Sequence, residues 1–323
     1  MRIVNGRERL VCAVLVMWGV MLAACVDLDL EPSQHTWQAP TPTPTPFAFG
    51  DSVPWRALGG GKLVFYRESF SLPPYLVVLD CETRTAIQWL VPRGFDNEPR
   101  PMVSPNGQWI AYRRYREILG ESNIWRVTTM LTDPNPLTLN ADASEPTWSP
   151  GGELYYYDGG SDLRVVGPDF SLRRLPSDVS RWIRPSVTHG RRIAVAGRQA
   201  LYIWEPGAGF LGLRPEIGDD EILALAWSPD GMQLALVTRS TWRASLWLMR
   251  EDGSDLHRIL LSPRSLVCPP CMDVSWSPWG DQLALNMPGA DRNTHVYVVN
   301  ADGSDRVPVT TADADDWNVS WGL

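Results

Sequence analysis

The stretch Trp227-Ser228-Pro229-Asp230-Gly231, followed by the apolar run 234–237, decides the fold. The unit returns at 148–152 and 276–280, in weaker form from Val103 and Val187, and truncated at 319–322. One residue marks each copy, and the marks are Val103, Trp148, Val187, Trp227, Trp276 and Trp321. Their separations are about 45, 39, 40, 49 and 45 residues. A period of this size, with one four-stranded sheet per repeat, is typical of β-propeller blades.

Each repeat predicts four short strands, of which the innermost ends at the mark and is reversed by the Pro-Asp-Gly turn. Asp-Gly pairs in 251–255 and 300–305 predict the hairpin between the third and fourth strands. Residues 62–91 lack an innermost strand before them, and the innermost strand 317–321 lacks three strands after it. We therefore expect an all-β, six-bladed propeller, closed by pairing the C-terminal innermost strand with the N-terminal three strands.

Composition limits the function. The repeat favours one propeller domain in the 323 residues, because each blade needs its neighbours to bury its faces. The 16 tryptophans are explained in part by the marks, where packing between blades accounts for Trp148, Trp227 and Trp276. The net charge of −8 argues against nucleic acid as a partner, since phosphate contacts need clustered Lys and Arg. We expect a monomer.

The N-terminus predicts export and a lipid anchor. Basic residues precede the apolar run 10–22, and Leu22-Ala23-Ala24-Cys25 resembles a bacterial lipobox, in which the cysteine is lipidated. The alternative is an ordinary secretory signal with an incidental cysteine. We expect a signal peptide over 1–24 and a lipid-anchored Pro/Thr-rich tether without fold over 25–57. The propeller of 58–323 would then be held on the extracytoplasmic side of a cell membrane by lipid alone.

The repeat resembles a known family. The Trp-Ser-Pro-Asp-Gly unit, the Leu-Ala-rich strand after it and the Asp-Gly-Ser hairpin are similar to the PD40 (WD40-like) repeat of TolB-type β-propellers. The resemblance covers 58–323, with three good copies of the motif and three degenerate ones. The tether leaves no room for the α/β domain that precedes the propeller in the family's founding member. The resemblance implies a propeller that binds a ligand at a channel mouth.

The loops that join each fourth strand to the next innermost strand are acidic and are expected on one face of the ring. Their carboxylates are Asp96, Glu98, Asp142, Glu145, Asp178, Asp219, Asp220, Glu221, Asp273, Asp313, Asp315 and Asp316. Converging at one mouth of the channel, they would attract a cation, a basic peptide or a free amino terminus. The alternative is that each carboxylate caps its own turn.

Loops between second and third strands on the same face carry arginines and Trp242. Arginine and aromatic residues are the usual anchors of a binding surface, although a solvated rim of charges is the alternative. The candidate ligand-binding residues are therefore Glu98, Asp142, Glu145, Asp220, Glu221, Arg239, Trp242, Arg243, Asp273, Asp315 and Asp316.

Cysteine and histidine usage predicts neither a cofactor nor a zinc site. We interpret Cys268-Pro-Pro-Cys271 as a local disulfide, with a redox pair as the alternative, and expect Cys81 to be unpaired. The four histidines are scattered along the chain, which does not favour zinc. A cation at the acidic mouth is the one bound ion that the pattern allows.

The sequence contains no catalytic motif such as G-x-S-x-G or H-E-x-x-H. We therefore predict a non-enzymatic binding protein or scaffold, whose partner is an envelope protein, a peptide or a cell-wall glycan. One alternative is a polysaccharide lyase or hydrolase that uses channel carboxylates with a bound cation. A second alternative is a solute-capturing module of an envelope transporter.

Overall fold

The computed structural model describes the propeller and a short segment before it. The described residues are 43–46, 52–69, 74–91, 99–116, 120–139, 142–159, 162–166, 171–172, 175–177, 179–180, 183–188, 190–241, 243–262, 273–289, 291, 293–311 and 314–323. Within these ranges the only helix is a short 3₁₀ turn, η2 (Trp55–Ala57). No helix in the described part of the chain is long and apolar enough to cross a membrane.

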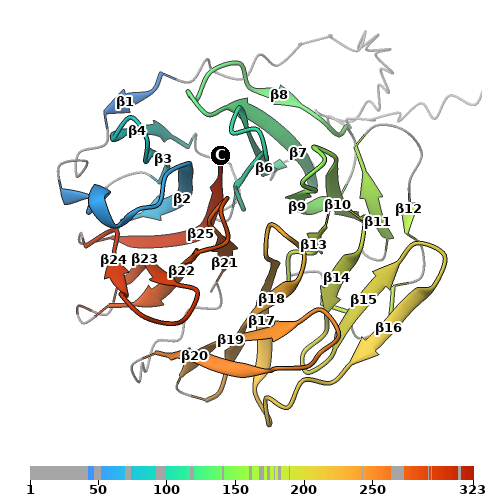
Figure 1. The fold of residues 1–323 in the computed structure, drawn as a ribbon. Coiled ribbons are helices and arrows are strands. Elements are labelled where there is room, and N and C mark those ends of the chain that lie inside the picture. The colour runs from blue at the N-terminus through green and yellow to red at the C-terminus, as the bar shows by residue number, and fades with distance from the viewer. Residues whose placement is uncertain are drawn as a thin grey trace, which may run out of the picture. The chain divides into compact units, whose positions relative to one another are not determined.

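Six antiparallel sheets form a ring, and each sheet is one blade (Figure 1). Blade 1 consists, from the inside outward, of β25 (Asp315–Gly322), β2 (Lys62–Glu68), β3 (Tyr75–Asp80), β4 (Thr85–Leu90) and β1 (Thr45–Pro46). Blade 2 consists of β5 (Met102–Val103), β6 (Trp109–Arg116), β7 (Glu121–Thr128) and β8 (Asn135–Pro136). Blade 3 consists of β9 (Ala143–Trp148), β10 (Leu154–Asp158), β11 (Asp162–Val165) and β12 (Ser171–Leu172).

The remaining three blades follow the same order from the channel outward. Blade 4 consists of β13 (Ser186–Val187), β14 (Ile193–Ala196), β15 (Leu201–Glu205) and β16 (Gly209–Leu213). Blade 5 consists of β17 (Glu221–Trp227), β18 (Gln233–Arg239), β19 (Ala244–Arg250) and β20 (His257–Leu261). Blade 6 consists of β21 (Val274–Trp276), β22 (Gln282–Pro288), β23 (Thr294–Asn300) and β24 (Val307–Pro308). The predicted six-bladed, all-β propeller is confirmed.

The ring is closed by the pairing of chain segments far apart in sequence. β25 pairs with β2 in a register that places Leu63 opposite Trp321 and Arg67 opposite Asp316. Figure 1 shows the red β25 beside the blue β2. This pairing satisfies the inner edge of β2, which would otherwise be free to associate with another chain. The predicted mode of closure is therefore also confirmed.

The tether segment 25–57 departs from expectation at β1 and at η2 (Trp55–Ala57). Thr45 and Pro46 form β1, which pairs with Gln88 and Ile87 of β4 as a fifth strand of blade 1. The prediction that this segment carries no fold is wrong for these residues. Proline is tolerated there because β1 is an edge strand, which needs hydrogen bonds on one side only.

Hydrogen bonds stabilise the turn that follows the mark in the motif copies. In blade 5, the Gly231 amide donates to the Ser228 carbonyl at 2.8 Å, and the Gln233 amide donates to Ser228 Oγ at 2.9 Å. Gly231 has a φ of 71°, which favours glycine. The degenerate copy in blade 4 keeps the turn, because the Arg191 amide donates to the Thr188 carbonyl and Arg191 takes the positive φ.

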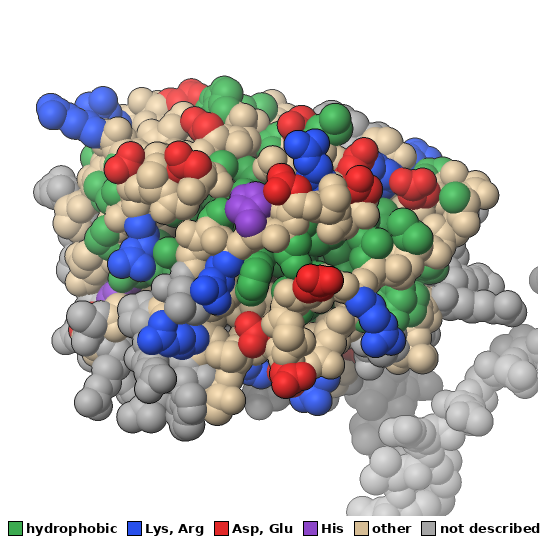
Figure 2. Space-filling view, turned by 60° about the horizontal axis from the view of Figure 1, so that its bottom comes forward, with side chains coloured by type: hydrophobic (Ala, Val, Ile, Leu, Met, Phe, Trp, Pro, Cys, Tyr) green, Lys and Arg blue, Asp and Glu red, His purple; other side chains and the backbone are tan. Residues whose placement is uncertain are grey.

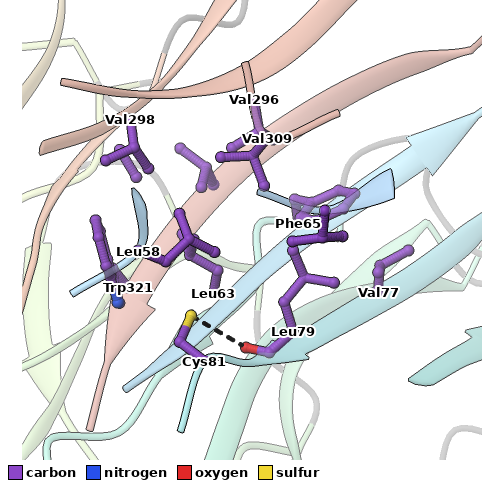
Figure 3. Close-up of a cluster of buried hydrophobic side chains, with 13 residues drawn as sticks. Leu58, Leu63, Phe65, Val77, Leu79, Cys81, Val296, Val298, Val309 and Trp321 are labelled. Atoms are coloured by element: carbon purple, nitrogen blue, oxygen red, sulfur yellow. Dashed lines mark hydrogen bonds between the residues drawn. The ribbon is translucent and has the colours of Figure 1, made fainter. Parts of the chain in front are cut away.

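The core is divided into six clusters, one at each interface between blades. Figure 3 shows the cluster between blades 6 and 1, to which blade 1 contributes Phe65 and Leu79 and blade 6 contributes Val296 and Val298. Mark tryptophans join neighbouring blades, because Trp148 Nε1 donates to the Met102 carbonyl at 3.1 Å and Trp276 Nε1 to the Ala226 carbonyl at 3.0 Å. This is the packing role that the repeat predicted for them.

Candidate functional site

The central channel contains a cavity of about 360 Å³ on the face that carries the Ser-Pro turns. We call this side of the ring the Trp-Ser-Pro face. Innermost strands of all six blades line the cavity. Its wall residues come mostly from the repeat motif itself, and they include Trp148, Trp227, Trp276, Trp321, Pro105, Pro150, Pro229 and Pro278. The motif therefore builds the cavity as well as the contacts between blades.

A layer of polar side chains occupies the channel at the position three residues before the mark in five of the six blades. Its members are Arg100, Glu145, Arg184, Asp273 and Asn318, and we call them the channel layer. Blade 5 has Ala224 at this position. All six residues are buried. Arg184 belongs both to the channel layer and to the lining of the cavity.

A local backbone irregularity explains why charged side chains reach this position. In blade 3, the register of β9 against β10 shifts between the pairs Thr147–Tyr155 and Ser144–Tyr157, so Glu145 lies in a β-bulge. A bulge turns a side chain out of the regular alternation of a strand. Glu145 has a φ of 50°, and Asn318 lies in a matching bulge of β25 with a φ of 57°.

Ion pairs of the channel layer cross the channel and connect four blades. Arg100 Nε lies 3.4 Å from Glu145 Oε1, and Arg100 Nη1 lies 3.9 Å from Asp273 Oδ2. On the other side, Arg184 Nη2 lies 3.6 Å from the same Asp273 oxygen. These ion pairs thus link blades 2, 3, 4 and 6, which are separate sheets that share no strand-to-strand hydrogen bonds.

Burial is the main influence on the pKa of the Glu145 carboxyl group in the channel layer. Burial raises the pKa of Glu145, and the neighbouring Arg100 and Arg184 oppose that rise only in part. Burial, together with the charge of Glu145, also raises the pKa of the buried Tyr157 hydroxyl. The channel layer therefore holds ionisable groups whose charged forms are costly.

Several polar atoms of the channel lack hydrogen bonds. Both carboxylate oxygens of Glu145 and both amide atoms of Asn318 are buried without a hydrogen-bond partner. The same holds for Nε and Nη2 of Arg184 and for Nε1 of Trp227. Such atoms are rare in native interiors because each costs free energy, which makes this channel the candidate site of the protein.

On the opposite face, the predicted carboxylates mostly have partners within their own or a neighbouring strand. Ser122 Oγ donates to Asp142 at 3.3 Å, Thr238 Oγ1 to Asp220 at 3.1 Å, and the Thr294 amide to Asp315 at 2.7 Å. These bonds correspond to the alternative in which each carboxylate supports its local structure.

Two predicted acidic residues pair with arginines instead. Asp316 is fully buried and accepts two hydrogen bonds from Arg67, at 2.7 and 2.8 Å. Glu221 accepts from Arg239 at 2.9 Å and lies 3.2 Å from Arg198. Glu145 and Asp273 come together in the channel layer, away from these pairs. The acidic loops therefore supply structural ion pairs in addition to any contact with a ligand.

Other predicted residues give less information. Arg243 is half-buried, and its carbonyl accepts a hydrogen bond from the Ser240 amide. Glu98, Trp242, Cys25, Cys268 and Cys271 lie outside the described residues. Among the residues that are described, no group of three His, Cys, Asp or Glu side chains could hold a metal ion.

Cys81 has a free thiol, as expected, and is buried in the cluster between blades 6 and 1 (Figure 3). Burial, with the nearby Asp80 charge, raises the pKa of this thiol to about 12. A thiol in this state is a poor nucleophile, because the thiolate is the reactive form. Cys81 is therefore a packing residue.

Sequence reasoning missed three members of the channel layer, namely Arg100, Arg184 and Asn318. The first two carry a readable signal, since Arg100-Pro101 and Arg184-Pro185 repeat the charge-proline pair of Glu145-Pro146 at the same distance before the mark. Asn318 has no such signal, because no proline follows it.

The surface adds no concentrated charge on the side that Figure 2 brings forward. Acidic and basic side chains are interspersed there among the residues drawn in colour, with hydrophobic groups between them. The excess of acidic residues behind the net charge of −8 therefore does not form one acidic patch among the coloured residues of this view.

Comparison with known proteins supports the fold. No protein-family model and no curated protein matches the chain. Among solved structures, TolB from Acinetobacter baumannii has a TM-score of 0.64 at 16% identity, over 81% of this chain and 66% of that one. A protein assigned as a TolB from Agrobacterium tumefaciens has a TM-score of 0.56 at 17% identity, over 82% of this chain and 100% of that one.

A third similar structure is the β-propeller domain of the Trilobed protease from Pyrococcus furiosus. Its TM-score is 0.51 at 11% identity, over 79% of this chain and 96% of that domain. The chain spans just under two thirds of the A. baumannii protein, and identities this low establish architecture alone. The blades, their closure and these similarities together show that this chain has the fold of the TolB-type β-propellers.

Proposed function

We propose that the protein is an extracytoplasmic lipoprotein whose propeller binds a partner protein or peptide on the Trp-Ser-Pro face. The observation that carries the proposal is the cavity, which opens among motif residues of all six blades. Large apolar side chains are exposed on the same face, including Trp279 (53%), Met232 (58%) and Leu323 (48%). Exposed apolar groups beside a cavity favour a binding surface, and tryptophan is enriched among residues that dominate binding energy.

This face lies opposite the predicted acidic mouth. We favour the Trp-Ser-Pro face because most described carboxylates of the acidic loops already form hydrogen bonds or ion pairs within the protein. The enzyme alternative expected desolvated carboxylates beside a cation or a base. Glu145 and Asp273 are desolvated, but they lie against Arg100 and Arg184, which favours binding over that alternative.

The face can be tested by capture of partners from envelope extract, using the full-length protein in detergent as bait. A Trp279→Ala variant removes the exposed ring on the Trp-Ser-Pro face. A matched Leu211→Ala variant removes an equally exposed side chain on the outer strand β16 (55%). We expect native and Leu211→Ala baits to retain one partner that Trp279→Ala loses at least about tenfold. Equal retention by all three folded baits would contradict the proposed face.

The anchor is tested separately, at Cys25. Leu22-Ala23-Ala24-Cys25 follows a basic and then an apolar segment, which supports lipidation of the cysteine. We expect the native protein to fractionate with membranes and to incorporate a fatty-acid label. A Cys25→Ala variant should take up no label, and equal labelling of both proteins would exclude Cys25 as the anchor.

A further inference from the structure

The six blades have six outer edges, and five of them carry features that keep sheet edges apart. The edge of β4 is covered by β1. β8, β12 and β24 are two residues long, and Pro136 and Pro308 lie in the first and the last of these. β20 contains Arg258 and pairs with β19 in a register that shifts. Short length, proline, charge and irregular pairing all prevent association at sheet edges.

The sixth edge, formed by β16, has none of these features. The strand is five residues long, Gly209-Phe210-Leu211-Gly212-Leu213, contains neither proline nor charge, and pairs with β15 in a regular register. It is the outermost strand of blade 4, on the rim of the ring (Figure 1), and no described segment pairs with its outer side. Leu211 is 55% exposed. Such an edge is a template for a further strand.

The sequence of β16 is close to self-complementary. Antiparallel pairing of two copies about Leu211 places this residue opposite its own copy and places Phe210 opposite Gly212. Gly212 leaves room for the ring, because Tyr202 of β15 is the only described side chain within 4 Å of its Cβ position, chain neighbours aside. An aromatic ring beside a glycine of the adjacent strand stabilises a sheet edge. The pattern therefore favours a second copy of this strand as the partner.

The charges that flank β16 favour the same arrangement. Glu205 lies opposite Gly209 at one end of the strand, Arg214 follows Leu213 at the other end, and both charged residues are exposed. Antiparallel pairing brings the acidic end of one strand to the basic end of its copy, and twofold symmetry repeats this contact. These attractions offset part of the repulsion between two chains of net charge −8.

We propose that two copies of the chain associate through β16, which joins two four-stranded sheets edge to edge across a twofold axis. This differs from the monomer that the sequence led us to expect. Pairing of two such short strands belongs to the class of small interfaces, below about 1,200 Å², which are transient. The association is therefore weak and reversible in solution.

Sedimentation of the full-length protein in density-matched detergent, over a range of concentrations, measures this association. We expect a dimer whose share rises with concentration. Leu211→Lys should weaken it at least about tenfold, because like charges would then face each other across the pair. The matched control is Leu139→Lys, since Leu139 is 76% exposed and lies outside β16. This control should dimerise as the native protein does.

A second measurement tests the register of the pairing. Under mild oxidation, Leu211→Cys should form a disulfide between two copies, because the Cα atoms of directly opposite residues lie within the range that a disulfide spans. Leu213→Cys should form none, because its position faces Gly209 of the other copy. Mass spectrometry of the linked peptides identifies the bond, so the native cysteines do not confuse the result.

A native chain that stays monomeric at all concentrations would overturn the proposal, and so would native dimerisation of a folded Leu211→Lys variant. Equal cross-linking through positions 211 and 213 would also overturn it, because this indicates random collision. Cross-links from position 211 to a foreign peptide would assign the edge to a different strand. β16 lies on the rim, so none of these results changes the expected Trp279-dependent capture of a partner, and the two proposals can fail separately.

Discussion

Glu145 has a carboxyl group that water does not reach, and this gives the protein a pH dependence that an exposed loop residue would not. Burial raises its pKa above the ordinary value of 4.5, with Arg100 and Arg184 opposing the rise. In the window above 4.5, the folded state therefore keeps a proton that the unfolded state has lost. The free energy of unfolding then decreases as pH rises from 4.5 through the folded pKa.

Replacing this side chain by its neutral isostere should remove that decrease. We expect Glu145→Gln to lose less stability than the native protein as the pH rises above 4.5, because its amide does not titrate. Thermal melts across this range measure the difference, with the exposed Glu216→Gln as control. The buried Asp316, whose pKa burial also raises, keeps part of the dependence in both proteins. Parallel curves for native and Glu145→Gln would contradict the assignment.

The candidate site was only partly predictable at this scale. Glu145 and Asp273 stand out in the sequence as loop carboxylates, but strand alternation cannot show that a bulge turns Glu145 inward beside Arg100. The motif tryptophans were predictable as packing residues from their period. Their second role, as walls of a cavity, depends on six strands meeting at one axis, which no single repeat contains.

At the scale of elements, the close approach of β25 to the start of β2 requires glycine. Gly61 has a φ of 72°, and a Cβ there would lie 2.3 Å from the Gly322 carbonyl oxygen. Gly152, in the turn of blade 3, has a φ of 86° but nothing within 4 Å of its Cβ position. The two residues thus share a conformation and differ in their surroundings.

Alanine at these positions should separate conformational strain from close packing. We expect Gly152→Ala to cost about 1 kcal/mol, which is the strain of a left-handed residue. Gly61→Ala should cost about 3 kcal/mol or more, because the backbone of β25 must also move. Denaturant unfolding of both variants measures these values, and equal costs would show that the contact with Gly322 is unimportant.

Most elements were readable from the sequence because propensity, turn chemistry and period agree in them. The repeat predicted the strand order and even the partner of β2. It did not predict β1, because Thr45 and Pro46 belong to a segment whose composition indicates extended chain, and an edge strand needs little more than that. The motif copy in blade 4 is degenerate, yet Thr188 and Arg191 form its turn without the Ser-Pro-Asp-Gly residues.

At the scale of the whole molecule, β25 closes the ring by hydrogen bonds and by the buried pair of Arg67 with Asp316. Removing residues 315–323 would leave the inner edge of β2 unpaired and the Arg67 charge buried without its carboxylate. Loss of one partner of a buried ion pair costs about 3–5 kcal/mol. An exposed sheet edge additionally favours association with other chains.

We therefore expect a chain truncated after 314 to self-associate and to lose its cooperative melt. A permuted chain that carries 315–321 before residue 62, joined by a Ser-Pro-Asp-Gly turn, should restore both properties. Light scattering after size exclusion and thermal melts measure the outcome. A truncated chain that stays monomeric and melts like the native protein would show that five blades and a fragment suffice.

The same closure has a consequence for the time course of folding. Arg67 and Asp316 are 249 positions apart in the chain, so the contact that completes blade 1 closes a loop of almost the entire propeller. Contacts between residues so far apart in the chain form slowly, because closing the long loop costs conformational entropy before the new contacts contribute favourable free energy. Blades 2 to 6 can assemble from segments that are adjacent in the chain. Blade 1 cannot be completed until β2, near the N-terminus, pairs with β25 at the C-terminus. Refolding should accordingly end in a slow phase that follows the burial of Trp321, long after most of the sheet signal has appeared.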